Sequence, residues 1–247
     1  MARQTRTALI TGSGRNIGRG CAIALASAGF NVVVNGSRDG SACERVADEV
    51  RGRGSDAKVV MADIGDRSAV EALAREALEA FGTVDVLINN AAIRPAVPFL
   101  DMTDDDLSDV MTVNCYAAVW LARAFLPGMI ANRWGRIINF SGMNAQQGTG
   151  GRPSVTMSKH AAWGLTKALS REFGAKGITS NIISPGTFPG EGDNPMHQER
   201  LDKLRAENPT GRLGQTEDIS TLVAWLCSDE GGFFNGQLLQ VNGGVVG

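Results

Sequence analysis

Short apolar runs rich in β-branched residues alternate along this chain with longer segments of helical period. Strands that are separated by helices run parallel, and the helices cover both faces of their sheet. We therefore expect an α/β fold, a doubly wound parallel sheet of about seven strands with helices on both faces. The expected strands are 7–11, 31–35, 57–61, 84–89, 136–141, 179–184 and 237–241, and the expected helices lie near residues 16–28, 41–53, 67–81, 104–132, 154–175 and 216–228.

A chain of 247 residues can form one such unit, and no repeat or linker divides it, so we expect residues 1–247 to be a single domain. The one long irregular region is 186–213, which is rich in Pro, Gly and charge and follows the sixth expected strand. Ligands of doubly wound sheets bind beyond the carboxyl ends of the strands. We therefore expect a substrate lid at about 186–213, the alternative being a solvated, partly disordered loop.

The formal net charge of −2 is ordinary and gives no reason to expect a nucleic-acid partner. The N-terminus shows no signal-peptide pattern, and no apolar run approaches the length of a membrane span, so cytoplasmic residence without membrane association is expected. The four cysteines form no CxxC pair and favour buried free thiols, so no metal site is expected.

A glycine-rich turn lies between the first expected strand and the first expected helix. Residues 11–18 read TGSGRNIG; glycines there let the backbone approach a pyrophosphate, and the helix end offsets its charge. A glycine motif alone is weak evidence, because any tight turn can use glycine. Its place between strand and helix favours a dinucleotide site, for which the candidates here are Gly12, Ser13, Arg15, Asn16, Ile17 and Gly18.

This turn resembles the TGxxxGxG fingerprint of the short-chain dehydrogenase/reductase family, and the resemblance covers essentially the whole chain. Asn16 replaces the middle glycine, which is tolerable because Asn also adopts left-handed backbone conformations. The resemblance implies a Rossmann-like fold and further cofactor contacts. Those contacts would come from Asp63 and Ile64 after the third strand, from Asn90, Ala91 and Ala92 after the fourth, and from Pro185, Gly186 and Phe188 after the sixth.

Charge at the end of the second strand bears on which nicotinamide cofactor binds. An acid there would hydrogen-bond a free ribose 2′-hydroxyl, whereas a basic residue accommodates a 2′-phosphate. The chain has no acid before Asp39 and offers Ser37 and Arg38, with Arg15 as a second guanidinium suited to bidentate phosphate contact. NADP is therefore favoured over NAD. The alternative for each arginine is a solvated surface side chain.

The family resemblance also extends to the catalytic residues, but only in part. Asn114 and Lys159 resemble its Asn and Lys, so that Lys159 would hydrogen-bond the nicotinamide ribose and Asn114 would help to hold a water. Val155 stands four residues before Lys159, where the family has its tyrosine, and Gly142 stands where its serine most often falls. Gly190 likewise replaces a threonine that contacts the nicotinamide carboxamide. The usual proton donor and polarising hydroxyl are thus missing from their places.

These gaps change the expected chemistry. A positioned general acid contributes about 10²–10⁴-fold, so ordinary carbonyl reduction by the usual route is disfavoured. An iminium ion or a conjugated C=C can accept hydride without that acid. We therefore predict an NADP-dependent oxidoreductase acting on an activated C=N or C=C bond, or an unusual carbonyl, of a small molecule. Ser141, Asn144, Arg152 or a lid residue are further candidates for the proton donor.

Two alternatives keep the cofactor turn without this activity. The chain is then a catalytically inactive cofactor-binding homologue, serving as a sensor or partner subunit, or a non-redox isomerase or lyase on the same scaffold. The resemblance also implies a homotetramer or homodimer, formed through the helices near 104–132 and 154–175. Of the histidines, His160 points about 100° away from Lys159 on a helix and is expected to be buried or at an interface, and His197 in the lid is expected to be exposed.

Overall fold

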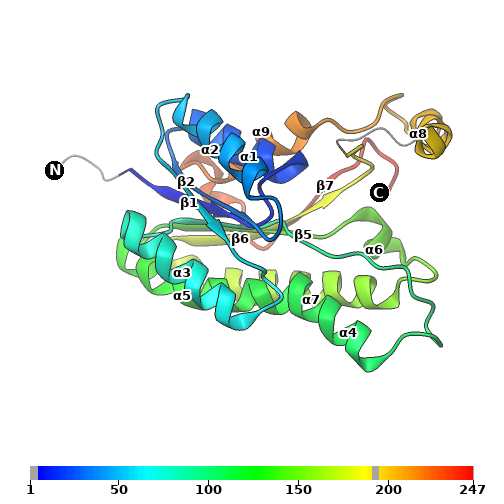
Figure 1. Cartoon of the computed structure of the whole chain (residues 1–247), viewed down its shortest axis with the longest axis horizontal. Helices are drawn as coiled ribbons and strands as arrows, with labels where there is room; N and C mark the ends of the chain where they lie inside the picture. Colours follow the sequence, from blue (N-terminus) through cyan, green and yellow to red (C-terminus); the bar gives the residue numbers. More distant parts are fainter. Residues whose placement is uncertain (1–4, 191–194, 247) are drawn as a thin grey trace.

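The computed structural model describes residues 5–190 and 195–246, with the side chains of residues 195–197 left out. Within these ranges the chain forms one parallel sheet in the order β3-β2-β1-β4-β5-β6-β7. The predicted doubly wound sheet is confirmed (Figure 1). The strands are β1 Thr7–Ile10, β2 Asn31–Gly36, β3 Ala57–Met61, β4 Val86–Asn89, β5 Gly135–Phe140, β6 Ile178–Pro185 and β7 Leu238–Val241.

Helices cover both faces of this sheet, as Figure 1 shows. Successive strand residues point to opposite faces, so that Val32 and Val34 pack in one core cluster and Val33 packs in the other. On the first face lie α1 Asn16–Ser27, α2 Gly40–Arg51 and α9 Thr216–Leu226. On the second face lie α3 Arg67–Phe81, α5 Ala117–Asn132 and α7 Pro153–Phe173.

The long helix expected over 104–132 is interrupted in the structure. It consists of α4 Asp104–Met111, a π-helical turn η1 at Thr112–Tyr116, and α5. Single π turns occur frequently at functional sites, and this one contains Asn114. The stretch Asp104–Asn132 is long and apolar enough, by length and composition, to cross a bilayer, but half of its apolar window is buried inside the fold. That burial is typical of a core helix.

The expectation of an irregular region over 186–213 is partly wrong, because α8 Pro195–Ala206 lies inside it. The charged residues that suggested a loop are helix-compatible, since Lys203 and Arg205 lie in the last turn, where they complement the helix dipole. The sequence did not predict the short helix α6 Met143–Gln147 or the 3-10 turns η2 Gly174–Lys176 and η3 Glu230–Phe233.

The place of the functional site follows from the strand order. The chain passes from β1 outward through β2 to β3 and then returns to β4 on the other side of β1. At such a reversal the connections leave the sheet in opposite directions, and a crevice opens beyond the carboxyl ends of the two central strands. The glycine turn after β1 and the Asn90 stretch after β4 both lie at this crevice.

Candidate cofactor and active site

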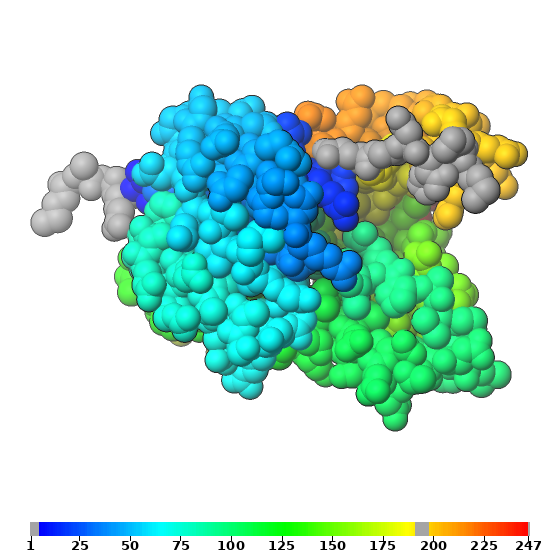
Figure 2. All heavy atoms as spheres, viewed as in Figure 1, coloured from blue at the N-terminus to red at the C-terminus, as the bar shows by residue number. Residues whose placement is uncertain are grey.

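A cleft of about 870 Å³ lies at the carboxyl ends of β1, β2, β3 and β4. Figure 2 shows the molecular surface hollowed where the N-terminal segments, blue to cyan, meet the green segments of the middle of the chain. Of the residues predicted to contact cofactor, the lining includes Gly12, Arg15, Ser37, Arg38, Asp63, Ile64, Ala91 and Ala92.

The glycine turn has the backbone that the sequence predicted. Asn16 has φ of 50°, in the left-handed region, which confirms that it can stand in for a glycine there. Gly12 has φ of 63°. A Cβ atom at Gly18 would lie 2.3 Å from the Gly12 carbonyl oxygen and 2.7 Å from Asn90 Nδ2, so α1 packs against the turn only with glycine there.

A buried hydrogen-bond network holds this turn in place. Asn90 Nδ2 donates to the carbonyl oxygens of Thr11 (2.9 Å) and Gly12 (3.0 Å). Ser13 Oγ donates to the Ile10 carbonyl and accepts from the backbone N–H of Asn35. The side chains of Ser13 and Asn90 therefore position the turn. Neither lines the cleft, and their contact with a cofactor stays a prediction.

The structure changes the interpretation of Asp39 near the end of β2. Its carboxylate accepts hydrogen bonds from the Ala42 N–H (2.9 Å) and the Ser41 hydroxyl (2.8 Å), which caps α2. The Ala42 bond, and then the Ser41 bond, hold the pKa of Asp39 below its ordinary value. This acid caps the helix through Oδ1, and it lines the cleft together with Arg15 and Arg38, which are also exposed.

Cys43 is a lining residue that the sequence analysis did not single out. A Cβ atom at Gly36 would lie 2.6 Å from its sulfur, and one at Gly14 would lie 3.1 Å away. The sequence shows Gly14 and Gly36 on separate segments, but only the fold shows that both lie against the Cys43 sulfur. All four cysteines are free and buried, as predicted.

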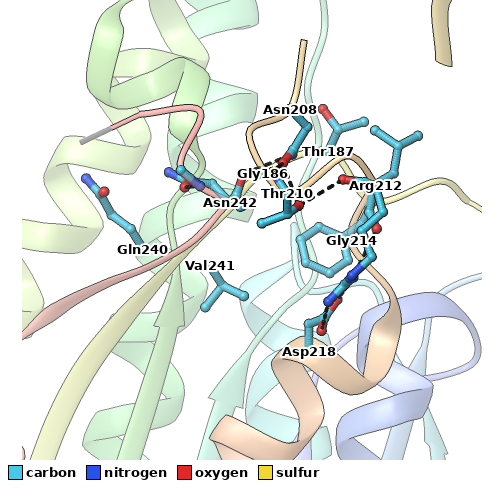
Figure 3. A pocket seen from close by; sticks show the side chains of 14 residues that line it. Gly186, Thr187, Asn208, Thr210, Arg212, Gly214, Asp218, Gln240, Val241 and Asn242 are labelled. Atoms are coloured by element: carbon cyan, nitrogen blue, oxygen red, sulfur yellow. Dashed lines mark hydrogen bonds and ion pairs between the residues drawn. The ribbon is translucent and has the colours of Figure 1, made fainter. Parts of the chain in front are cut away.

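A second pocket, of about 300 Å³, lies between the loop after β6 and the end of β7. Figure 3 shows Asn208, Thr210 and Arg212 gathered beside Asn242. Gly186 and Phe188 line this pocket and not the larger cleft, and the Phe188 ring packs where a Gly214 side chain would be. Cofactor contacts by Gly186, Phe188, Pro185 and Ile17 stay predictions, and Ile17 packs against a core cluster.

Asn114 is fully hydrogen-bonded within the protein. Its Oδ1 accepts from the Ile93 N–H (2.9 Å), and its Nδ2 donates to the Ile93 carbonyl (3.0 Å) and to Ser158 Oγ (3.0 Å). The side chain thereby joins the segment after β4 to helix α7. Ser158 Oγ in turn donates to the Val155 carbonyl (2.9 Å).

Lys159 is buried, with 4% of its surface exposed, and its Nζ donates to the Phe140 carbonyl at 2.8 Å. Burial, and after it repulsion from Arg94, lower the pKa of this ammonium from 10.5 to about 7. Lys159 therefore titrates near neutral pH. Val155, one helical turn earlier, is also buried and provides no titratable or hydrogen-bonding group beside it.

Gly142 lies at the exit of β5, with φ of 175° and ψ of 147°. This backbone is extended, and nothing lies within 4 Å of a Cβ atom placed there. The adjacent Ser141 is buried. The chain's tyrosine, Tyr116, is 45% exposed and packs against Trp120, so it does not replace the missing phenol from the protein surface.

His160 is exposed in the single chain, so it is not buried in the core, and its expected place at an interface stays a prediction. Its Nδ1 lies 2.9 Å from the Thr156 carbonyl oxygen, and its ring lies 6.3 Å from that of Trp163. The side chain of His197 and residues 191–194 of the predicted lid lie outside the described parts of the chain. Arg94 was missed in the sequence, although it directly follows the Asn-Asn-Ala-Ala-Ile stretch after β4.

Comparison with known proteins agrees with this geometry. A family model described as Enoyl-(Acyl carrier protein) reductase matches residues 12–246. The 3-oxoacyl-[acyl-carrier-protein] reductase of Staphylococcus aureus is 33% identical over 243 residues, which cover 98% of this chain and 99% of the relative. The corresponding reductase of Escherichia coli is 31% identical over 240 residues, 97% of each chain.

Solved structures extend the comparison to the fold. A candidate short-chain alcohol dehydrogenase from Sinorhizobium meliloti superposes with a TM-score of 0.90 at 28% identity, covering 98% of this chain and 97% of its own. A candidate gluconate dehydrogenase from Agrobacterium tumefaciens gives a TM-score of 0.89 at 30% identity, covering 98% and 96%. With a matched family model, full-length reductase relatives and the same sheet and glycine turn, this chain belongs to the short-chain dehydrogenase/reductase family.

Proposed function

We propose that this protein is an NADP-dependent oxidoreductase acting on an activated C=C or C=N bond, or an unusual carbonyl, of a small molecule. The observation that carries the proposal is Lys159, a buried amine that titrates near neutral pH beside Val155. An amine with a pKa near the working pH is well matched to general acid–base catalysis. In the absence of a tyrosine at this place, Lys159 itself becomes the candidate proton donor.

The residues present fit a dinucleotide. The cleft has the volume for one, and the Gly12 and Gly18 positions leave the space that a Cβ atom would fill. Arg15 and Arg38, both exposed at the cleft, would hold the 2′-phosphate of NADP, and one oxygen of the neighbouring Asp39 caps α2. When bound, the nicotinamide supplies hydride, and the protein provides orientation, exclusion of water and the proton.

Substitution of Lys159 tests this proposal. In a Lys159→Met variant, NADPH oxidation with a panel of enoyl and iminium substrates should fall by about 10²–10⁴-fold, the usual contribution of a positioned general acid. The rate of the wild type should fall as pH rises through about 7, because the neutral amine has no proton to give. Stopped-flow absorbance of NADPH measures both, and Lys167→Met, an exposed lysine on the same helix, is the matched control.

Other results would point to the alternatives. NADPH binding without oxidation by any member of the panel would favour an inactive cofactor-binding homologue. Turnover without a change in nicotinamide absorbance would favour an isomerase or lyase. A pH-independent rate in the wild type, or full activity of Lys159→Met, would remove Lys159 as the proton donor and leave Ser141, Asn144, Arg152 or a lid residue.

The single domain, the lid over 186–213 and the cytoplasmic homotetramer or homodimer belong to the same proposal. They rest on the family resemblance and on the position of the segment after β6. A soluble enzyme of this kind would meet its small-molecule substrate in the aqueous phase and need neither nucleic acid nor membrane.

A further inference from the structure

Arg94, in the segment that follows β4, lies within electrostatic range of two other cationic side chains. The charges of Arg94 and Arg152 interact with each other, and the charge of Arg94 also interacts with Lys159. Arg94 follows Ile93, a cleft-lining residue, and Arg152 is the residue from which helix α7 begins. Lys159 lies seven residues further along, about two helical turns.

Asn114 holds the backbone next to Arg94 close to helix α7. It hydrogen-bonds the backbone of Ile93, the neighbour of Arg94, and also Ser158, the neighbour of Lys159. The two segments are thus tied together through a buried side chain. The backbone at Arg94 is therefore held beside α7, the helix that carries Lys159.

No carboxylate neutralises the two arginines. Among the residues that the structure describes, neither Arg94 nor Arg152 has an ion pair or a side-chain hydrogen bond. By contrast, Arg19 and Arg212 are each held by two hydrogen bonds to one carboxylate. The first turn of α7 contains no acidic residue either.

Arg94 also loses part of its hydration. Burial of the guanidinium lowers the pKa of Arg94, and repulsion from Arg152 lowers it further, although the residue as a whole is exposed. The exposed side chain is therefore reachable by a ligand. Two such like charges are repulsive without an anion between them, and guanidinium groups match the planar geometry of carboxylate and phosphate.

We propose that Arg94 and Arg152 together bind a carboxylate or phosphate group of the substrate beside Lys159. This inference depends on the proposed function only in treating the bound molecule as a substrate. It names the chemical class that the active site accepts, a small oxyanion-bearing electrophile, and it adds two binding residues to the site.

The same charges discriminate between the two kinds of activated bond. A bare iminium ion would be repelled by Arg94 and Arg152, whereas a conjugated C=C–C=O group develops negative charge on oxygen as it is reduced, and cations stabilise that charge. An unsaturated carbonyl compound that bears an acid group therefore fits best. An imine fits only if it carries its own carboxylate.

Binding can be measured without turnover. Fumarate and its neutral isostere fumaramide are titrated by calorimetry into protein saturated with NADP⁺, and inorganic phosphate is titrated in parallel to distinguish the two oxyanions. Wild-type protein should bind fumarate, phosphate or both, with fumarate about 10–100-fold tighter than fumaramide if the carboxylate is the ligand. In R94Q/R152Q the anion affinity should fall by about the same factor.

The controls separate charge from folding. R171Q removes an exposed arginine at the other end of α7 and should leave anion affinity unchanged. R94K/R152K keeps both positive charges but loses the planar, bidentate hydrogen-bonding geometry of the guanidinium groups, and it should bind the anion with intermediate affinity. NADPH affinity, measured by fluorescence for every variant, should equal that of the wild type and so report an intact fold.

The outcomes are distinct from those of the proposed function. Anion affinity that is equal in the wild type and R94Q/R152Q, or the absence of anion binding, would overturn the subsite even if NADPH oxidation is observed. Arginine-dependent anion binding in a protein that never oxidises NADPH would support the subsite and leave the oxidoreductase proposal to fail alone.

Discussion

At the scale of single residues, glycine positions decide whether the cofactor turn can exist. Gly18 faces the Gly12 carbonyl oxygen so closely that a Cβ atom would lie 2.3 Å from it. Gly142, in contrast, has an extended backbone and open space around it, although it occupies an equally suggestive place in the sequence. The same residue type thus has a steric role at one position and none at the other.

Gly18→Ala should therefore push α1 away from the turn. We expect NADPH affinity to fall by at least about 10-fold and the free energy of unfolding to fall by about 1–3 kcal/mol, the usual cost of inserting a methyl group into a packed site. Fluorescence titration with NADPH and urea unfolding measure the two quantities. Gly142→Ala is the control and should remain within about 0.5 kcal/mol of the wild type; an equal loss in both variants would contradict the steric argument.

At the scale of elements, one ion pair joins the segment after α8 to helix α9. Arg212 donates two hydrogen bonds to Asp218, of 2.6 and 2.7 Å, and Asp218 also accepts the Gln215 N–H at the start of the helix. Figure 3 shows this pair at the edge of the smaller pocket. Chiefly the hydrogen bond from Arg212, and after it the bond from the Gln215 N–H, lower the pKa of Asp218 from 3.8 to about 2.

This pair predicts a pH-dependent contribution to stability. Because the folded-state pKa is depressed, the stabilisation is present above about pH 4 and is lost as pH falls through about 2. Asp218→Asn keeps an acceptor for the helix but removes the charge, so its melting temperature should lie below that of the wild type at pH 7, and the gap should close toward pH 2. Asp48→Asn, at a more exposed pair, should change little. A gap that is constant over pH 2–7 would exclude the charge as its cause.

At the scale of the whole molecule, a cofactor bound in the cleft at the carboxyl ends of the strands should raise the thermal stability of the fold. A ligand at about 100 times its dissociation constant stabilises a protein by about 2.7 kcal/mol. For a chain of this length that energy raises the melting temperature by about 5–10 °C. Differential scanning fluorimetry can therefore compare cofactors directly.

NADPH should raise the melting temperature more than NADH at equal concentration, because Arg15 and Arg38 line the cleft while Asp39 is used as a helix cap. R15Q/R38Q should abolish this difference and preserve the shift with NADH, which needs no 2′-phosphate contact. Equal shifts with both cofactors in the wild type would contradict the assignment of NADP.

The sequence alone was sufficient for features that depend on local patterns. Strand and helix periods placed all seven strands to within about two residues at each end. The left-handed backbone at Asn16 also followed from its place in the glycine turn. These features are set by neighbouring residues, whose conformations and hydrophobic spacing can be read along the chain. The helix α8 was missed because a polar surface helix lacks that apolar spacing.

Only the tertiary structure decided what the functional side chains contact. Asp39 is the first acid after β2 in the sequence, and only the fold shows that its carboxylate caps α2. The side-chain amide of Asn114 donates hydrogen bonds to Ile93 and Ser158, which are far from it in sequence. Arg94 and Lys159 are separated by more than sixty residues, and their charges interact only because the segment after β4 is held against α7 through Asn114. Such contacts depend on distances in space, and the order of residues along the chain does not give those distances directly.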